Sequence, residues 1–315
     1  MVRKNTRILK RLAWLLPALL AIASNAQAQP VDPNGIALDR YEPPEPGDAF
    51  MAVPSPWIGG HLVPRLMLTY NVAGLPETLS GSRPAEYTPQ ISPLLNAYDV
   101  VVVQEDFWYH HLLVADVTHA YRSVPMVESP TLTNMGDGLN RFFIFPIEGH
   151  ERVTWADCNG TIDCSSDCLT PKGFSYARHQ LSSGVLLAVY NLHMDAGSCG
   201  GDFTARGVQV DQLIADINSR SAGQAVIVAG DTNLSDGRSD DMVMLDRLMT
   251  NAGLTDACRA LGCGSEELDR VLFRSSASLT LQALTWAFAD EFVDPSGHDL
   301  SDHPAIRVEI SWEAI

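Results

Sequence analysis

The chain has 315 residues, of which 46% are hydrophobic, and its formal net charge is −17 at pH 7. So acidic a protein repels polyanions at long range, which argues against a high-affinity nucleic-acid binder that works by neutralising phosphates. The charge does not exclude an enzyme whose bound cation supplies positive charge locally. The length suits one large domain or two small ones, and we expect one.

Residues 1–28 have the features of a secretory signal peptide. Five basic residues precede an apolar stretch over 12–22, and Ala26-Gln27-Ala28 is a suitable cleavage site. The apolar stretch is short for a membrane span and is interrupted by Pro17. Cleavage after Ala28 would leave 287 residues and take the net charge from −17 to −22, because the leader holds five basic residues and no acidic one. We therefore predict a secreted protein, extracellular or periplasmic.

All six cysteines follow this leader. An even number of cysteines in an exported protein predicts three disulfides, and the sequence leaves their pairing open. A zinc site is the competing interpretation. It would call for a CxxC pair matched by a second pair, and the sequence contains none.

Along the rest of the chain, residues 29–60 are rich in proline and lack periodicity, so we expect an extended N-terminal arm followed by one globular domain over 61–315. The hydrophobic periods predict strands at 65–72, 99–105, 141–145, 172–176, 184–191, 225–229, 268–273, 278–288 and 305–311, and helices at 90–98, 202–220 and 240–254. A loop stapled by cysteines is expected over 151–172. Strands follow strands in places and alternate with helices in others, so a two-sheet sandwich with outer helices fits better than a doubly wound sheet.

Polar side chains recur where these strands end or begin. Asp231 and Asn233 follow the apolar run 225–229, and in an extended chain their side chains point to the same side. Gly230, directly before Asp231, would let the backbone approach a ligand. The alternative is an Asx turn that caps a buried strand. The other strand-end residues are Asn71, Glu105, His193, Asp269, Asp302 and His303. Carboxylate and amide oxygens suit Mg²⁺, and histidines paired with carboxylates can supply a general base.

The motifs that contain these residues resemble those of the endonuclease/exonuclease/phosphatase superfamily, the DNase I-like enzymes, from about residue 65 to the C-terminus. The matching motifs, in the family's order, are TYNVAGLP, VVVQE, YNLHMDAG, AGDTN, ELDRVLF and LSDHPAI. The resemblance implies an α+β fold, a four-layer α/β/β/α sandwich of two packed mixed β-sheets flanked by helices. LTPKGFSY after a Cys-rich loop is most similar to the secreted bacterial neutral sphingomyelinases, although those enzymes usually have Gln or a similar residue where Asp195 stands and Tyr where Arg270 stands.

The resemblance also implies roles for the strand-end residues. Glu105 would bind the metal with Asn71 and, through water, Asp302. His193 and Asn233 would hold the phosphate. His303 would be the base that takes a proton from the attacking water, and Asp269 would orient the His303 ring. Asp231 would position the attacking water.

The activity that follows from the resemblance is that of a Mg²⁺-dependent phosphoric diester hydrolase, with Mn²⁺ or another divalent cation as an alternative. We expect a sphingomyelinase C-type enzyme that acts on a phospholipid headgroup. The alternatives are an extracellular DNase I-like endonuclease that acts on a nucleic-acid phosphodiester, and a catalytically silent binding protein of the same fold. Trp286 and Phe288 are candidates for peripheral membrane contact, with an ordinary strand whose rings face the core as the alternative. We expect a monomer.

Overall fold

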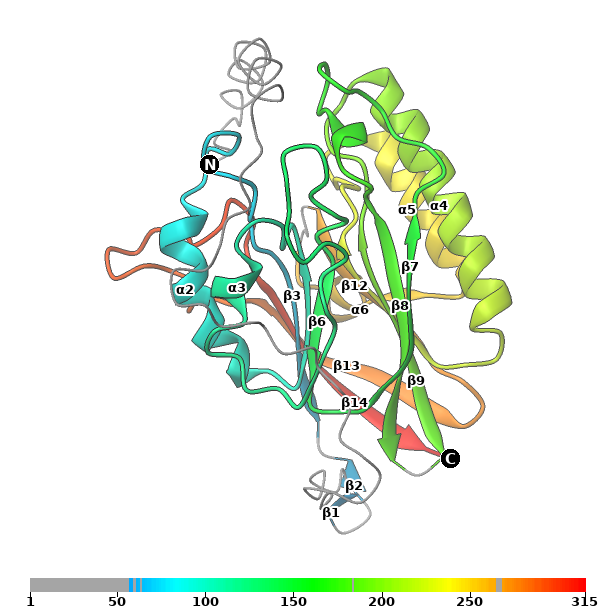
Figure 1. Cartoon of the computed structure of the whole chain (residues 1–315). Helices are drawn as coiled ribbons and strands as arrows, with labels where there is room; N and C mark the ends of the chain where they lie inside the picture. The colour runs from blue at the N-terminus through cyan, green and yellow to red at the C-terminus, as the bar shows by residue number, and fades with distance from the viewer. Residues whose placement is uncertain (1–56, 59–60, 63, 183, 265–267) are drawn as a thin grey trace. The chain divides into compact units, whose positions relative to one another are not determined.

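The computed structural model describes residues 57–58, 61–62, 64–182, 184–264 and 268–315 (Figure 1). The predicted signal peptide and almost all of the predicted arm lie outside these residues. The chain divides into two compact units, and the second, Pro56–Ile315, holds every described element, beginning with the short strands β1 (Trp57–Ile58) and β2 (His61–Leu62). No helix in the described part of the chain is both long and apolar enough to cross a bilayer.

One mixed sheet has six strands in the order β13-β14-β3-β4-β6-β5. In chain order these are β3 (Arg65–Asn71), β4 (Val100–Gln104), β5 (Tyr121–Arg122), β6 (Asn140–Phe143), β13 (Leu279–Phe288) and β14 (Ile306–Ala314). β3 and β4 run parallel, and every residue of β4 is buried, as its four valines predict. On one face of this sheet, Ile91 of α2 (Pro84–Leu94) and Leu113 of α3 (His110–Leu113) complete a hydrophobic core.

The second mixed sheet also has six strands, in the order β11-β12-β10-β9-β8-β7. In chain order these are β7 (Ile147–Thr154), β8 (Gly173–Ser182), β9 (Val185–His193), β10 (Val226–Asp231), β11 (Thr255–Asp256) and β12 (Asp269–Arg274). α4 (Gly200–Arg220) and α5 (Ser239–Ala252) pack together on it through Val210, Leu213 and Leu245. Two short helices, η2 (Asp167–Leu169) and α6 (Ala257–Leu261), lie in the connections.

The two sheets face each other, with α2 and α3 outside one and α4 and α5 outside the other, so the predicted four-layer sandwich is confirmed (Figure 1). Polar side chains join the sheets directly beneath the strand ends. Gln104 donates from Nε2 to Asn191 Oδ1 at 2.7 Å, and Asn191 Nδ2 donates to the carbonyl oxygen of Val103 at 2.9 Å. Because buried amides demand partners, these contacts favour one relative placement of the sheets.

Two predicted boundaries were wrong. The helix expected from residue 90 begins at Pro84, where a missing N–H costs nothing in the first turn, and it includes Pro89 and Pro93 before η1 (Leu95–Ala97) ends it. The loop expected from residue 151 is strand as far as Thr154. β7 is a half-exposed edge strand with charged residues, so it lacks the alternation by which strands are recognised.

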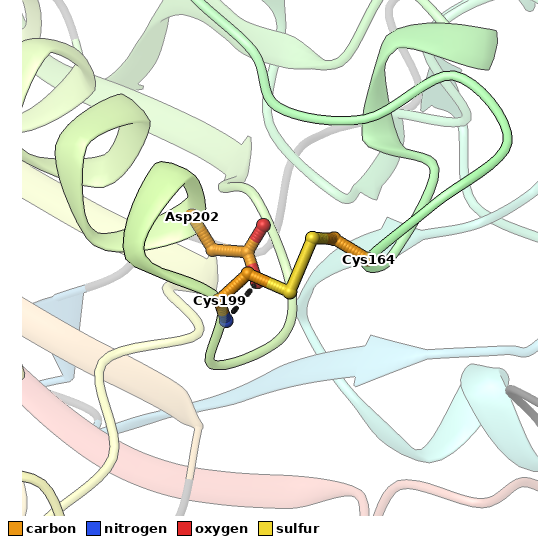
Figure 2. Close-up of side chains that lie close together, drawn as sticks. All are labelled: Cys164, Cys199 and Asp202. Carbon is orange, nitrogen blue, oxygen red and sulfur yellow. Dashed lines mark hydrogen bonds between the residues drawn. A yellow bond between two sulfur atoms is a disulfide. The ribbon is translucent and has the colours of Figure 1, made fainter.

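Three disulfides join Cys158 to Cys168, Cys164 to Cys199, and Cys258 to Cys263, as the count of cysteines predicts. The zinc interpretation is therefore wrong. The Cys164–Cys199 disulfide fastens the loop after β7 to the start of α4, where Asp202 Oδ2 accepts the backbone N–H of Cys199 at 2.7 Å (Figure 2). The loop is thus held at the same end of β9 as the predicted site.

Candidate active site

The predicted site residues converge where strands of both sheets end. β3 and β4 are parallel, and so are β9 and β10, so the carboxyl ends of each pair share one sheet edge. Asn71 ends β3 and Glu105 directly follows β4, while His193 and Asp231 lie opposite each other at the ends of β9 and β10. Asp269 begins the antiparallel β12 opposite Asp231. The site is therefore assembled from both sheets.

Asp231 lies close to several of the other candidate site residues. Its Oδ2 accepts a hydrogen bond from Asn71 Nδ2 at 3.2 Å, and the same oxygen lies 3.3 Å from His193 Nε2 and 3.7 Å from His303 Nε2. Its Oδ1 accepts the backbone N–H of Asn233 at 3.0 Å. One carboxylate oxygen thus forms the predicted Asx turn, while the other faces the cluster of candidate site residues. The Asx turn therefore does not exclude a catalytic role, which stays a prediction. Burial raises the pKa of Asp231 above its ordinary value.

Gly230 has a structural reason that the sequence did not indicate. Its φ is +142°, and a Cβ at this position would collide with the carbonyl oxygen of Leu192 on the neighbouring strand β9. The glycine is needed for the close approach of two parallel strands, and its expected approach to a ligand stays a prediction.

His303 and Asp269 form a second carboxylate–histidine pair. His303 donates from Nδ1 to Asp269 Oδ2 at 2.6 Å, which leaves Nε2 directed toward Asp231. Burial lowers the pKa of His303, but the adjacent carboxylates of Asp269 and Asp231 outweigh it and raise the pKa well above its usual value. His303 is therefore a strong base that Asp269 holds in one ring orientation.

Glu105 lies across Asn71 from this pair. Its Oε1 accepts from Asn71 Nδ2 at 3.1 Å, and its backbone adopts a left-handed conformation with φ of +55°. Gly74 fits beneath it, because a Cβ there would collide with the Glu105 carbonyl oxygen. Burial, with a smaller contribution from the charge of Asp302, raises the pKa of Glu105 to about 6. Among the described residues, the positive groups near this carboxylate do not offset that increase.

These residues fit a hard divalent cation. Glu105 accepts one hydrogen bond from the protein, which leaves lone pairs for a ligand, and exposed Asp302 is close enough for its charge to affect Glu105. A site with few protein oxygens suits Mg²⁺, which keeps several waters. Asn71 directs its NH₂ group at Glu105 and Asp231 while its Oδ1 accepts the backbone N–H of Ala73, so its contribution in this arrangement is to position the carboxylates.

His193 and Lys172 form the third part of the site. Lys172 Nζ donates to His193 Nε2 at 2.9 Å and to Asp167 Oδ1 at 2.5 Å. Burial, with the positive charges of Lys172 and His303, lowers the pKa of His193 well below its usual value, so this imidazole is neutral. Burial lowers the pKa of Lys172 while Asp167 and Glu105 raise it, and the net shift is upward, so the side chain remains an ammonium ion.

Lys172 was not among the residues predicted for the site, although it lies in the LTPKGFSY motif. A signal was present, because it is the sole lysine beyond residue 10. Its contact with His193 depends on the fold of the disulfide-stapled loop. Asp167 Oδ2 accepts the backbone N–H of Ala196 at 3.0 Å, which ties the loop to the chain just after β9.

Two predicted residues lie at the margin of this arrangement. Asn233 follows Asp231 with φ of +51°, and its Nδ2 donates to the carbonyl oxygen of Met194 at 3.0 Å. Asp302 is exposed and adjoins His303 in sequence. The structure brings the other six together: Asn71, Glu105, His193, Asp231, Asp269 and His303.

No protein-family model matches the chain. Curated proteins named sphingomyelinase, from Mycobacterium bovis and two strains of Mycobacterium tuberculosis, are each 38% identical to it over 265 residues, which cover 76% of this chain and 51% of the relative. The chain thus spans about half the length of the curated relatives it matches.

Solved structures share the fold. Sphingomyelinase C from Streptomyces griseocarneus is 20% identical with a TM-score of 0.56, over 78% of this chain and 99% of that one. A beta toxin mutant from Staphylococcus aureus, with bound magnesium ions, is 16% identical with a TM-score of 0.56 over 78% and 99%. TDP2 from D. rerio, in complex with a single-strand DNA product, is 17% identical with a TM-score of 0.59 over 78% and 98%.

The architecture is that of the DNase I-like sandwich, so the fold implied by the resemblance is confirmed. The predicted resemblance to the bacterial sphingomyelinases is confirmed by the curated relatives of that name.

Proposed function

We propose that the chain is a secreted, divalent-metal-dependent phosphodiesterase of the sphingomyelinase C type, which cleaves a phospholipid to release its phosphorylated headgroup. The observation that carries the proposal is the arrangement around Asp231. A histidine oriented by a carboxylate lies on one side of it, and Asn71 and Glu105 lie on the other. The similarity to curated sphingomyelinases supports the choice of substrate.

In this proposal the neutral form of His303 takes the proton of the attacking water at Nε2, because its Nδ1 is already committed to Asp269. Asp231 holds the water, since its Oδ2 faces His303. Glu105 and Asp302 would hold Mg²⁺, with Mn²⁺ as an alternative, and Asn71 positions Glu105. When bound, the cation would supply Lewis-acid polarisation of a phosphate oxygen.

The remaining groups act on the phosphate. The Lys172 ammonium is a donor that can stabilise the charge that develops on the phosphate oxygens during in-line attack. His193 is assigned to the same task on the strength of its place in the YNLHMDAG motif; this role requires its Nε2, which here accepts from Lys172, to carry the proton of the neutral ring. Asn233 is assigned to the same task on the strength of its place in the AGDTN motif; this role requires its amide to leave Met194.

The setting of the enzyme is also proposed. Disulfides agree with an oxidising compartment, extracellular or periplasmic. Trp286 and Phe288 pack ring against ring with centroids 4.9 Å apart, and Phe288 is 37% exposed. Phe288 pairs with Ile306, close in sequence to His303, so we propose this pair as a peripheral membrane contact. All the site residues come from one chain, which is compatible with a catalytic monomer over residues 61–315.

The test is a substrate panel. The mature protein is assayed on sphingomyelin, plasmid DNA and a small phosphate monoester, each with Mg²⁺ and with excess chelator. We expect hydrolysis of sphingomyelin that chelator abolishes. Activity confined to DNA would make the chain an endonuclease, and activity unchanged by chelator would contradict the metal mechanism. Glu105→Gln should raise the Mg²⁺ concentration needed for half-maximal rate, whereas Glu313→Gln, at the end of β14, should not.

A further inference from the structure

A pocket of about 300 Å³ lies beside the candidate active site, under the disulfide-stapled loop. Lys172 forms one wall, and the same side chain donates to His193. Lys172 therefore contacts both the pocket and His193, which is assigned to the phosphate. Its other walls are Thr154, Trp155, the Cys158–Cys168 disulfide, Leu169, Thr170, Pro171 and Asp195.

The pocket contains a carboxylate with no cationic partner. Asp195 is fully buried, and its two oxygens accept hydrogen bonds only from amides, the backbone N–H of Asn159 at 2.6 Å and Gln209 Nε2 at 2.7 Å. Within the described residues it takes part in no ion pair. Burial and the charge of Asp167 raise its pKa to about 6, so it is largely ionised at neutral pH. A buried carboxylate without a positive partner is costly, and a bound cation would relieve that cost.

The nearby lysine does not cancel this preference. Lys172 already pairs with Asp167 at 2.5 Å, so its ammonium charge is offset. Asp195 lines the pocket, while Asp167, outside the lining, offsets the one ammonium ion that lines it. The net charge of Asp195, Lys172 and Asp167 together is negative, so an organic cation can bind beside Asp195.

The other walls favour a weakly hydrated cation over a metal ion. A metal ion needs several oxygen ligands, and apart from Asp195, Lys172 and two threonines the pocket is lined by Trp155, Leu169, Pro171 and a disulfide. Aromatic and apolar walls around one carboxylate are the surroundings in which quaternary ammonium groups bind, because such a cation loses little hydration and gains attraction from the ring.

We propose that this pocket binds the quaternary ammonium end of the substrate headgroup, with Asp195 as the counter-charge and Trp155 and Leu169 as the apolar walls. The assignment rests on the proposed function, since Lys172 then contacts both the phosphate and the pocket that receives the cation of the same headgroup. Asp195 becomes a specificity-determining residue that selects choline-type headgroups.

The test measures binding without turnover. Calorimetric titrations of the mature protein in Mg²⁺ use phosphocholine and its uncharged analogue of the same shape, 3,3-dimethylbutyl phosphate. We expect phosphocholine to bind about tenfold more tightly to the wild-type protein. Asp195→Asn should reduce this preference to about twofold or less, with the affinity for methyl phosphate unchanged, because it removes the counter-charge and leaves the phosphate contacts.

Leu169 provides a matched pair of variants that does not depend on a buried substitution. It is 47% exposed at the pocket, so neither Leu169→Lys nor Leu169→Glu should impair folding. Leu169→Lys should abolish the preference by repelling the cation, and Leu169→Glu should keep or increase it. Equal binding of the two ligands to the wild-type protein, or a full preference in both Asp195→Asn and Leu169→Lys, would overturn the proposal.

These results are separable from the proposed function. If the protein prefers phosphocholine but hydrolyses no sphingomyelin, the cation-binding pocket is supported and the proposed enzymatic function is contradicted. If it hydrolyses sphingomyelin but binds the two ligands equally, the proposed function is supported and the cation-binding pocket is contradicted.

Discussion

His303 Nδ1 lies 2.6 Å from Asp269 Oδ2, and the other nitrogen of the same ring lies 3.7 Å from Asp231 Oδ2. The ring thus has one nitrogen committed to orientation and one available for chemistry. Asp269→Asn preserves the size of the side chain but removes the charge that fixes the imidazole. We expect kcat to fall on the order of 10²- to 10⁴-fold, as for other losses of an oriented general base.

The control for this prediction is Asp246→Asn, which alters a largely exposed carboxylate on α5 that pairs with Arg259. It should leave kcat within about twofold, because exposed ion pairs contribute little. If Asp269→Asn retained wild-type kcat while His303→Ala lost it, Asp269 would have no part in orienting the base.

Lys172→Met should lower kcat by roughly 10²- to 10³-fold, because it removes a buried charged donor from the phosphate position. Lys172→Arg should recover part of the loss, since charge is kept but geometry is not. The measurement is the initial rate at saturating Mg²⁺. Because no other lysine follows residue 10, an amine-selective reagent offers a second check: substrate analogues should protect Lys172 from modification.

The Cys164–Cys199 disulfide closes 35 residues and fastens the loop that carries Asp167 and Lys172. The chain-entropy model assigns such a loop about 4 kcal/mol, and we expect the double variant with Ser at both positions to lose roughly 2–4 kcal/mol in urea unfolding. The matched pair, Cys258 and Cys263, closes only 5 residues and should cost less when replaced in the same way. A greater loss in that second variant would contradict this account.

The raised pKa of Asp195 should make the free energy of unfolding depend on pH. Burial raises its pKa in the folded protein from the ordinary value of 3.8 to about 6, so the folded state holds the proton more tightly than the unfolded state. The stabilisation from protonation is present below about pH 4 and is lost as the pH rises through about 6. The free energy of unfolding of the wild type, relative to Asp195→Asn, should therefore decline between pH 4 and pH 7 and be level above it. A relative rise over that window would contradict the assigned shift.

Much of the sandwich could be predicted from particular residues. The valines of β4 specify a strand buried on both faces, and Asn71, Glu105, His193 and Asp231 all follow apolar runs at positions where parallel strands end. Strand ends that share a sheet edge bring side chains together without any knowledge of loops. This is why six of the eight predicted residues meet in the structure.

The contacts that could not be predicted depend on loops. Lys172 reaches His193 only because the loop from 158 to 172 folds back over β9, and its path follows from a disulfide pairing that spacing does not determine. The steric requirement at Gly230 could not be predicted either. A glycine required by a neighbouring strand and one required by a ligand look the same in sequence, and only the register with Leu192 separates them.

The most direct test of the central claim is hydrolysis of sphingomyelin in water enriched with oxygen-18, followed by mass spectrometry of both products. Water held between Asp231 and His303 attacks phosphorus, so the account predicts one labelled oxygen in phosphocholine and none in ceramide, with no product from His303→Ala. Label in the ceramide, or labelled phosphocholine from His303→Ala at the wild-type rate, would contradict it.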